Sequence, residues 1–561
     1  TELDVVVQHI EQVAKDRQIT QLAQPWLPPL KSQIFLQDLR PDSFQDLWQK
    51  ESSLEAIVGL VDIPSEQRQT VGTYALTDDG NLAIFGGPSM GKSSLLQTIV
   101  MDLSRQHTPE QIHFYIFDFG TSALYPLKNL PHTADFITSD QEEKLTKFMD
   151  LMKREIQSRK RLFNRHHVNS KAMYQTVTDE VLPQIIVVVD NYEGYKDIPT
   201  EQLRNKFDIF IQTLARDGNS LGITIIVSGG RLAAIRPVLL ANFKTRLSLK
   251  LTDESEIKTI MGHYTISTES IAGRGLITIE EVEVFQAALS NRGATPVQRL
   301  QALRQEISQM DHLWQGNRPA KIPIVPEEIS LAQFMDRADT KNAMAKPALP
   351  LGLDMTTVET IALDFSTFRD LVVFSNNSEQ VRLMVDRLIA TVSQSSWSIT
   401  VLLLDVNGDY QTYASKVSHY VSDPTLLSDM TDFMVSEINN REANGWDRYC
   451  IAFIPDLESY ERVSGLTQAE LATLMTRGFR VGFFLIVGTI YSYLVSINPV
   501  PKYLKENGQY YFIGMKLSDQ NFLDKAYNAK ERQPAMDEAY IHNRKTYYKL
   551  KLSHNSTEAT F

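Results

Sequence analysis

Cysteine is nearly absent from this chain of 561 residues, where Cys450 is the single one. A framework of disulfide bonds is therefore excluded, and the composition fits a reducing compartment. Cys450 precedes an apolar run, so we expect it to be a buried small side chain. An excess of positive charge is also lacking. The formal net charge is -12 at pH 7, which makes nucleic-acid binding a poor default function.

Long apolar runs without charge are equally scarce. Residues 481–501 form such a run, and it is long enough to raise the question of a membrane span. Gly482, Gly488, Pro499 and Pro501 interrupt it, however. This pattern predicts a buried strand followed by a turn-rich loop, and no membrane span within this chain.

The segment from Gly86 to Ser93, Gly-Gly-Pro-Ser-Met-Gly-Lys-Ser, fits the phosphate-binding loop pattern Gly-x-x-x-x-Gly-Lys-Ser/Thr. An expected strand at 82–85 leads into it and an expected helix at 94–103 follows. In such a loop the backbone N–H groups surround phosphate oxygens, Lys92 reaches the β- and γ-phosphates, and the Ser93 hydroxyl binds Mg²⁺. The predicted ATP-binding residues are Gly86, Gly87, Pro88, Ser89, Met90, Gly91, Lys92, Ser93 and Ser94.

Asp190 ends a run of apolar, β-prone residues downstream of the loop. An NTPase sheet places there the carboxylate that holds the Mg²⁺. We therefore predict that Lys92 and Asp190 are catalytic and that Ser93 and Asp190 form the Mg²⁺ site. The alternative is that Asp190 only caps the segment that follows.

The residue after Asp190 is Asn191, whereas many motor ATPases have a glutamate there that polarises the attacking water. An amide cannot accept a proton at neutral pH. Glu193 is the candidate replacement, although we expect it to project differently. The sequence thus predicts ATP hydrolysis that is slow or depends on a partner.

Four arginines follow Asp190, and one of them could contact the terminal phosphate of a neighbouring subunit's ATP. They are Arg216, Arg231, Arg236 and Arg246. We favour Arg216 because it precedes the expected strand at 222–227; surface ion pairs are the alternative role. The basic stretch at 153–165 is interpreted as a solvated amphipathic helix, with a nucleic-acid-binding helix as the alternative.

The chain repeats one architecture. The segment 81–85 is matched by 370–374, and the loop that follows the second segment aligns Lys92 with Val381 and Ser93 with Arg382. A loop without the lysine, the hydroxyl and the glycines cannot surround a triphosphate in the usual way.

Two strand ends repeat as well: Asp118 is matched by Asp405, and Asp190 by Asp456. Continuous apolar strands separated by helices indicate an α/β fold with a largely parallel sheet covered on both faces.

These patterns divide the chain into five parts. We expect a lead-in helix and extended linker at 1–50, an ATPase-like domain at 51–320, a proline-rich linker at 321–345, a degenerate second domain at 346–555, and a disordered tail at 556–561. The first residue is Thr1 rather than Met, so we also expect the chain to be part of a longer protein.

The order of the phosphate loop, Asp118, the 190–193 segment and the strand at 221–227 resembles FtsK/SpoIIIE-type motor ATPases. The lead-in Pro-Trp-Leu-Pro-Pro at 25–29, the 59–64 segment and the tandem second copy narrow the resemblance. They look like the membrane-anchored EssC/EccC-type ATPases of type VII secretion, over nearly the whole chain.

This resemblance implies two tandem RecA-like P-loop NTPase domains with mostly parallel sheets, the second copy degenerate. It implies MgATP as ligand, a ring or hexamer of the chain, and partners among the type VII membrane components. It places the chain at the cytoplasmic face of the bacterial cell membrane, anchored by segments upstream of Thr1. The expected cargo is small helical WXG-type proteins, recognised by the second domain.

Three departures from DNA-pumping members favour protein export over DNA translocation. Asn191 replaces the usual Glu, Ser-Gly-Gly at 228–230 stands where those members have Thr-Gln-Arg, and no winged-helix domain follows. A DNA translocase of the FtsK class and a nucleotide-gated scaffold remain the alternatives. A purely structural second domain is the alternative to a partner-binding one.

Overall fold

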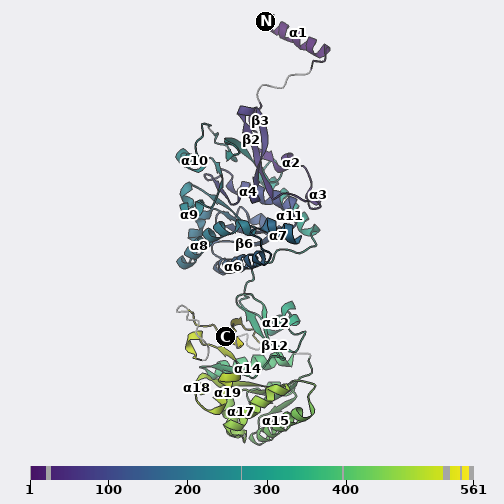
Figure 1. Cartoon of the computed structure of the whole chain (residues 1–561), viewed down its shortest axis with the longest axis vertical. Helices are drawn as coiled ribbons and strands as arrows, with labels where there is room; N and C mark the ends of the chain where they lie inside the picture. Colours follow the sequence, from purple (N-terminus) through teal and green to yellow (C-terminus); the bar gives the residue numbers. More distant parts are fainter. Residues whose placement is uncertain are drawn as a thin grey trace. The chain divides into compact units, whose positions relative to one another are not determined.

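The computed structural model describes residues 2–19, 27–266, 268–394, 397–521, 531–543 and 546–554. The chain forms two compact units, residues 1–322 and 323–561, which Figure 1 colours from purple to teal and from teal to yellow. The expected tail at 556–561, and Pro25 and Trp26 of the expected lead-in, lie outside the described residues.

The first unit is built on one sheet with a parallel half and an antiparallel half. The parallel half runs in the order β9 (Thr245–Leu249), β4 (Leu82–Phe85), β8 (Ile223–Gly229), β7 (Gln184–Asp190), β5 (Ile112–Asp118) and β6 (Thr133–Ile137). Beyond β9 the antiparallel half continues with β10 (Arg274–Thr278), β11 (Val282–Leu289), β2 (Glu55–Ile63) and β3 (Arg68–Ala75), while β1 (Ile34–Phe35) pairs with β11.

Helices cover both faces of this sheet. They are α2 (Leu36–Leu39), α3 (Phe44–Leu47), α4 (Leu76–Asp79), α5 (Lys92–Gln106), α6 (Glu142–Arg165), α7 (Lys171–Thr178), α8 (Glu201–Asp217), α9 (Pro237–Leu240), α10 (Glu254–Met261) and α11 (Pro296–Leu313). A further helix, α1 (Glu2–Asp16), precedes them and has no buried residue. Along β7, Ile186 and Val188 pack with α5 and α11, whereas Val187 and Val189 pack with α6 and α8. Burial on both faces is the reason why the parallel strands are continuously apolar.

Part of the expected lead-in is built into the first unit. β1 pairs with β11, the side chain of Leu36 is fully buried, and Phe44 lies in one of the two cores. The interpretation of all residues up to 50 as a lead-in is therefore wrong for 34–47, because these short apolar segments cover the end of the sheet.

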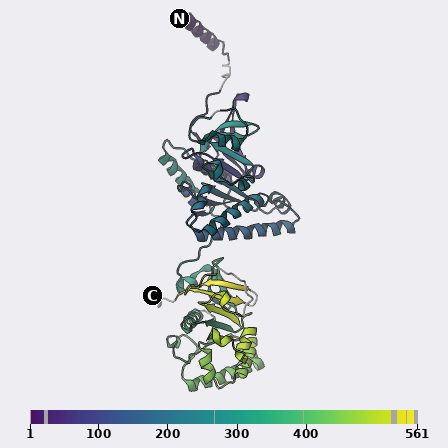
Figure 2. The same ribbon diagram turned by 90° about the vertical axis from the view of Figure 1, so that its left-hand side faces the viewer.

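The second unit repeats the same strand order. Its parallel half is β19 (Gln509–Ile513), β14 (Leu371–Ser375), β18 (Phe483–Ile490), β17 (Cys450–Ile454), β15 (Thr400–Leu404) and β16 (His419–Val421). The antiparallel half is β20 (Glu538–Asn543), β21 (Thr546–Lys551), β12 (Ala348–Asp354) and β13 (Thr360–Asp364), of which β20 and β21 are yellow in Figure 2. The predicted α/β fold, repeated in tandem, is confirmed.

The helices of the second unit are α12 (Leu331–Asp336), α13 (Ala338–Ala343), α14 (Ser378–Ser393), α15 (Pro424–Asn444), α16 (Leu457–Val463), α17 (Gln468–Gly478), α18 (Tyr491–Leu494) and α19 (Pro499–Asn507). Two segments, 321–345 and 481–501, differ from expectation. The helices α12 and α13 lie in the expected linker at 321–345. A capping box of Ser330 and Gln333 begins α12, and Phe334 of this helix is buried in the core of the second unit.

The charge-free run at 481–501 contains the predicted buried strand, β18. The turn-rich loop predicted after it is only partly right, because α18 and the beginning of α19 occupy most of it and only residues 495–498 form a turn. Pro499 does not prevent the second of these helices, since proline is compatible with a first helical turn. In the described part of the chain, no helix combines the length and the apolar character that a membrane crossing requires. Cys450 is buried, as predicted.

The basic stretch at 153–165 forms the second half of α6. The helix is amphipathic, as predicted, but Arg159 is buried rather than solvated. Its guanidinium donates hydrogen bonds to the carbonyls of Leu221 (2.7 Å) and Pro183 (3.0 Å), so this charge holds the ends of neighbouring segments together.

Candidate nucleotide-binding site

The loop at 86–91 lies where β4 ends, at the edge of the sheet where the parallel strands finish. Three backbone hydrogen bonds hold it to its neighbours: Gly86 N–H donates to Gly229 O (3.2 Å), Gly87 N–H to Lys250 O (2.8 Å), and Gly273 N–H to Met90 O (2.8 Å). Gly91 has φ 101°, a left-handed conformation that favours glycine. The loop is thus fixed by the sheet before any phosphate reaches it.

Lys92 begins α5, and its side chain is almost fully buried. The ammonium donates to the carbonyls of Gly86 (2.7 Å) and Gly87 (3.2 Å), so it lies directly over the loop. Burial lowers the pKa of Lys92, and the charges of Asp190 and Glu193 oppose that shift. Three of the four predicted catalytic side chains, Lys92, Asp190 and Glu193, therefore lie in one electrostatic environment.

Asp190 is fully buried at the end of β7, and both of its oxygens are held by hydroxyls. Ser93 Oγ donates to Oδ2 (2.6 Å) and Ser228 Oγ donates to Oδ1 (2.6 Å). Burial raises the pKa of Asp190, whereas the hydrogen bonds from Ser228 and Ser93 oppose this shift. The backbone N–H of Asn191 donates to Ser228 Oγ (2.8 Å) and completes the network.

The Ser93 and Asp190 oxygens fit a Mg²⁺ site. Mg²⁺ prefers hard oxygen ligands, and proteins bind it through one or two side chains while waters and phosphates fill the other positions. A hydroxyl and a carboxylate oxygen 2.6 Å apart, next to a phosphate-binding loop, provide such a pair.

Glu193 lies in a short 3₁₀ segment, Tyr192–Asp197, and lines a cavity beside the phosphate loop. Oε1 accepts a hydrogen bond from Gly230 N–H (2.9 Å). Asn191 also lines this cavity, but its amide packs against Gly120, where an added Cβ would come 2.1 Å from Nδ2. Of the residues that follow Asp190, Glu193 is therefore the one that brings a carboxylate to the cavity.

The cavity beside the loop has a volume of about 590 Å³. Its lining residues are Pro88, Ser89, Gly91, Lys92, Ser93, Ser94, Thr121, Asn191, Glu193, Gly230 and Arg231. Gly86, Gly87 and Met90, which were also predicted to bind ATP, do not line this cavity. Gly86 and Gly87 bond to strand ends and Lys92, and Met90 packs on the core beneath.

The structure separates the four candidate arginines. Arg231 is exposed and lines the cavity of its own chain. Arg216 pairs with Asp217 at the end of α8, next to Ala215, whose carbonyl accepts a hydrogen bond from the Asn81 side chain at the start of β4. Arg216 thus lies at the edge where the parallel strands begin, opposite the phosphate loop, and its role in trans stays a prediction.

The other two candidates have partners outside the cavity. Arg236 forms an ion pair with Asp208, and Arg246 donates to the carbonyls of Phe243 and Leu240. Sequence spacing did not single out Arg231, because that requires knowing where the chain turns after β8. The signal available was its position directly after two glycines at a strand end.

The register of the second sheet corrects one sequence match. In the first unit Val189 pairs with Val227, so the next pair across the sheet is Asp190 and Ser228. In the second unit Ile454 pairs with Val487, which places Pro455 opposite Gly488. Pro455 therefore occupies the place of Asp190, and the match of Asp190 with Asp456 is wrong by one residue.

Asp456 has a different task, because it is the N-cap of α16. Its carboxylate accepts hydrogen bonds from the backbone N–H (3.0 Å) and hydroxyl (2.7 Å) of Ser459. Burial alone would raise the pKa of Asp456, but these bonds and one from Asn407 hold it below its usual value.

The phosphate loop is replaced in the second unit by an additional helical turn. α14 begins at Ser378, four positions after Phe374, whereas α5 begins at Lys92, seven positions after Phe85. Asn377 caps α14 with its own side chain, which accepts from Glu379 N–H. The free backbone donors that would bind phosphate are thus partly used within the chain.

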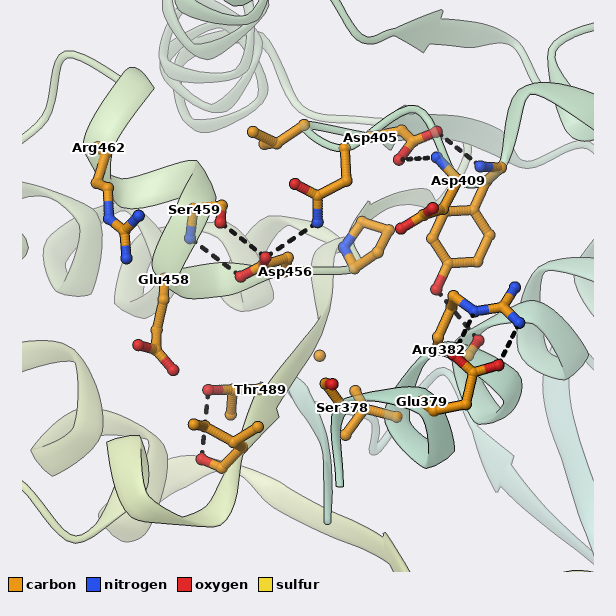
Figure 3. Close-up of a pocket in the computed structure, with 17 residues that line it drawn as sticks. Ser378, Glu379, Arg382, Asp405, Asp409, Asp456, Glu458, Ser459, Arg462 and Thr489 are labelled. Atoms are coloured by element: carbon orange, nitrogen blue, oxygen red, sulfur yellow. Dashed lines mark hydrogen bonds and ion pairs between the residues drawn. The ribbon is translucent and has the colours of Figure 1, made fainter. Parts of the chain in front are cut away.

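A cavity of about 490 Å³ nevertheless remains at the same edge of the second sheet. Arg382, paired with Glu379, and Arg462, next to Glu458, lie on opposite sides of it (Figure 3). Asp409 adds a further carboxylate. The mixed charges and the missing loop distinguish this cavity from the nucleotide site of the first unit.

Comparison with known proteins supports this picture. The sequence profile described as the FtsK/SpoIIIE family matches residues 42–269. Type VII secretion system protein EssC of Staphylococcus aureus (strain MRSA252) is 30% identical over 558 residues, which cover 98% of this chain and 37% of that protein. ESX secretion system protein EccC of Geobacillus thermodenitrificans (strain NG80-2) is 28% identical, over 95% of this chain and 36% of that protein.

A solved structure described as EssC (ATPases 2 and 3) from Geobacillus thermodenitrificans is also similar. It has a TM-score of 0.78 and 25% sequence identity, covering 94% of this chain and 100% of that structure. The chain therefore spans little more than a third of these curated relatives, and corresponds in fold to a tandem pair of ATPase domains.

Proposed function

Because this chain carries an FtsK/SpoIIIE-family domain and is homologous along nearly its whole length to the EssC and EccC ATPases of type VII secretion, we propose that it is the ATP-driven part of a protein-export motor. Its first unit binds and hydrolyses MgATP. The contact between Ser93 and Asp190, which joins the phosphate loop to the end of β7, is the single observation that carries this proposal.

Each residue of the site has a separate role in the proposed reaction. Backbone N–H groups of the loop bind the phosphates, and Lys92 neutralises charge that develops on the terminal phosphate. Ser93 and Asp190 would hold Mg²⁺, which supplies charge neutralisation at the β- and γ-phosphates when bound. Glu193 accepts a hydrogen bond from the attacking water, and Arg231 contacts the terminal phosphate from within the same chain.

The second unit serves a partner rather than a nucleotide. Support comes from the missing phosphate loop, from Pro455 in the place of Asp190, and from a cavity of mixed charge in their stead. In this proposal the chain works as a ring beside type VII membrane components at the cytoplasmic face of the membrane. Small helical WXG-type proteins are the cargo.

Nucleotide binding to the full chain tests the proposal. Titration of a fluorescent ATP analogue with Mg²⁺ is expected to give one site per chain. Lys92→Ala should abolish the saturable signal or weaken it about 100-fold, in line with the loss of a charge-assisted phosphate contact. The matched control is Arg382→Ala, which alters the aligned segment of the second unit and should leave affinity unchanged. Two sites of equal affinity, or wild-type affinity in Lys92→Ala, would contradict the proposal.

A further inference from the structure

Glu193 and Gly230 come from different elements and meet at the wall of the nucleotide cavity. Gly230 directly follows β8, and its N–H donates a hydrogen bond of 2.9 Å to Oε1 of Glu193. Oε2 of the same carboxylate is buried and has no hydrogen-bond partner within the described part of the chain. Because an unpaired buried oxygen is costly, a donor entering the cavity would be stabilised there.

The absence of a side chain at position 230 is required by this contact. A Cβ built on Gly230 would lie 2.7 Å from Oε1 of Glu193. The backbone itself does not need glycine here, since Gly230 is not among the residues with positive φ in the described chain. We therefore attribute this glycine to the close approach of the carboxylate.

The main chain on both sides of Gly230 is fixed. Ser228 Oγ donates to Asp190 (2.6 Å), Gly229 O accepts from Gly86 N–H (3.2 Å), and Leu232 N–H donates to Glu256 Oε2 (3.0 Å). The N–H of Gly230 thus has a set position relative to both the phosphate loop and Asp190. A donor held this way can orient a side chain within the narrow limits that catalysis needs.

We propose that Gly230 is the positioning residue for Glu193: its N–H holds one carboxylate oxygen so that the other faces the attacking water. This inference rests on the proposed ATPase function. It also gives one cause to two separate features of the sequence, the amide at Asn191 directly after Asp190 and the glycine at position 230. A base placed three residues beyond the strand needs a backbone donor without a side chain to hold it.

The reaction step follows from this arrangement. The water oxygen bonds to the terminal phosphorus of ATP, and the bond between that phosphorus and the bridging oxygen breaks. The electron pair of the broken bond leaves with ADP, and one water proton passes to Oε2 of Glu193. The hydrogen bond from Gly230 keeps Oε1 in place throughout.

Gly230→Ala in the full chain tests the inference. The added methyl meets only the end of a flexible side chain, so we expect an unchanged thermal unfolding midpoint and unchanged ATP affinity. The turnover number should fall about tenfold or more, as expected for a misplaced general base. Where steady-state turnover is slow, a single-turnover quench experiment with the chain in excess over ATP measures the ratio of the variant's hydrolysis rate to that of wild type.

A double-variant cycle separates positioning from a general structural effect. In a Glu193→Gln background, addition of Gly230→Ala should cost no further activity, because the group that it displaces has already lost its function. If the losses of the two single variants multiply in the double variant, or if Gly230→Ala retains full turnover, the inference is overturned while the ATPase proposal stands. A wild-type chain that neither binds nor hydrolyses ATP would instead overturn the proposed function itself.

Discussion

The hydroxyl of Tyr503 donates a hydrogen bond of 2.7 Å to the carboxylate of Asp370, and both side chains are buried in the second unit. The other oxygen of Asp370 accepts from Leu485 N–H (2.9 Å). At the same place in the first unit, Asn81 accepts from Ile225 N–H (2.9 Å). The same contact between two strands therefore occurs within each unit, made by an acid in the second unit and by an amide in the first.

The acid at this place makes the stability of the second unit depend on pH. Burial raises the pKa of Asp370 from 3.8 to about 7. Between these two pH values the folded state retains a proton that the unfolded state has lost. The stabilisation that this proton gives is therefore complete below about pH 4 and is lost as the pH rises to about 7. Over this range the free energy of unfolding falls by about 1.4 kcal/mol per pH unit. Asp370→Asn, which copies Asn81, should raise the unfolding midpoint more at pH 8 than at pH 5. An equal change at both pH values would contradict this assignment.

Arg231 should distinguish ATP from ADP. Arg231→Ala is expected to lower the ratio of ATP to ADP affinity roughly 10- to 100-fold, the value of a lost charge-assisted hydrogen bond of about 1.5–3 kcal/mol. Competition binding with the two nucleotides measures it. Arg216→Ala is the control at the opposite edge of the sheet, and a loss of turnover in that variant would favour the role in trans that its sequence position suggested.

Asn191→Glu should not accelerate hydrolysis, although it restores the residue type found in many motor ATPases. Asn191 has φ 55°, a left-handed conformation that asparagine tolerates better than glutamate, and its amide lies against Gly120. We expect a loss of about 1–2 kcal/mol in the free energy of unfolding and turnover at or below that of wild type. Urea unfolding and steady-state turnover test this together, and faster turnover would show that the base belongs at 191.

Ser228 should matter for stability as well as for the site. Ser228→Ala leaves one oxygen of the buried Asp190 and the N–H of Asn191 without their partner, so the free energy of unfolding should fall by about 1–3 kcal/mol. Ser248→Ala on β9 is the matched control, because the hydroxyl of this buried serine bonds only to the neighbouring carbonyl of Leu249 among the described contacts. Equal losses in the two variants would argue against a special role for the Asp190 network.

Sequence reasoning found the parts of the site that local patterns encode. The glycine and lysine spacing of the loop and the apolar run before Asp190 are sufficient, because a strand, a tight turn and a helix follow one another there. Gly230 could not be found in this way, and Arg231 could not be chosen over the other three candidate arginines, since the roles of both depend on how the chain turns after β8. The match of Asp456 with Asp190 failed for a related reason: both follow apolar strands, but the neighbouring strands set the register, and a one-residue difference leaves little trace in composition.

The strand register at Pro455 bears on whether substitutions could give the second unit an ATP site. A site lost through one side chain can be regained by one substitution. Here the second unit lacks the glycines, the lysine and the hydroxyl of the loop, its helix begins about one turn earlier, and a proline stands in the place of Asp190. The number of residues between the strand and the aligned helix positions is the same in both units, so the difference lies in many side chains together and not in the length of the backbone. No single substitution therefore restores a second ATP site, and efforts to engineer one here need the whole loop sequence exchanged together with Pro455.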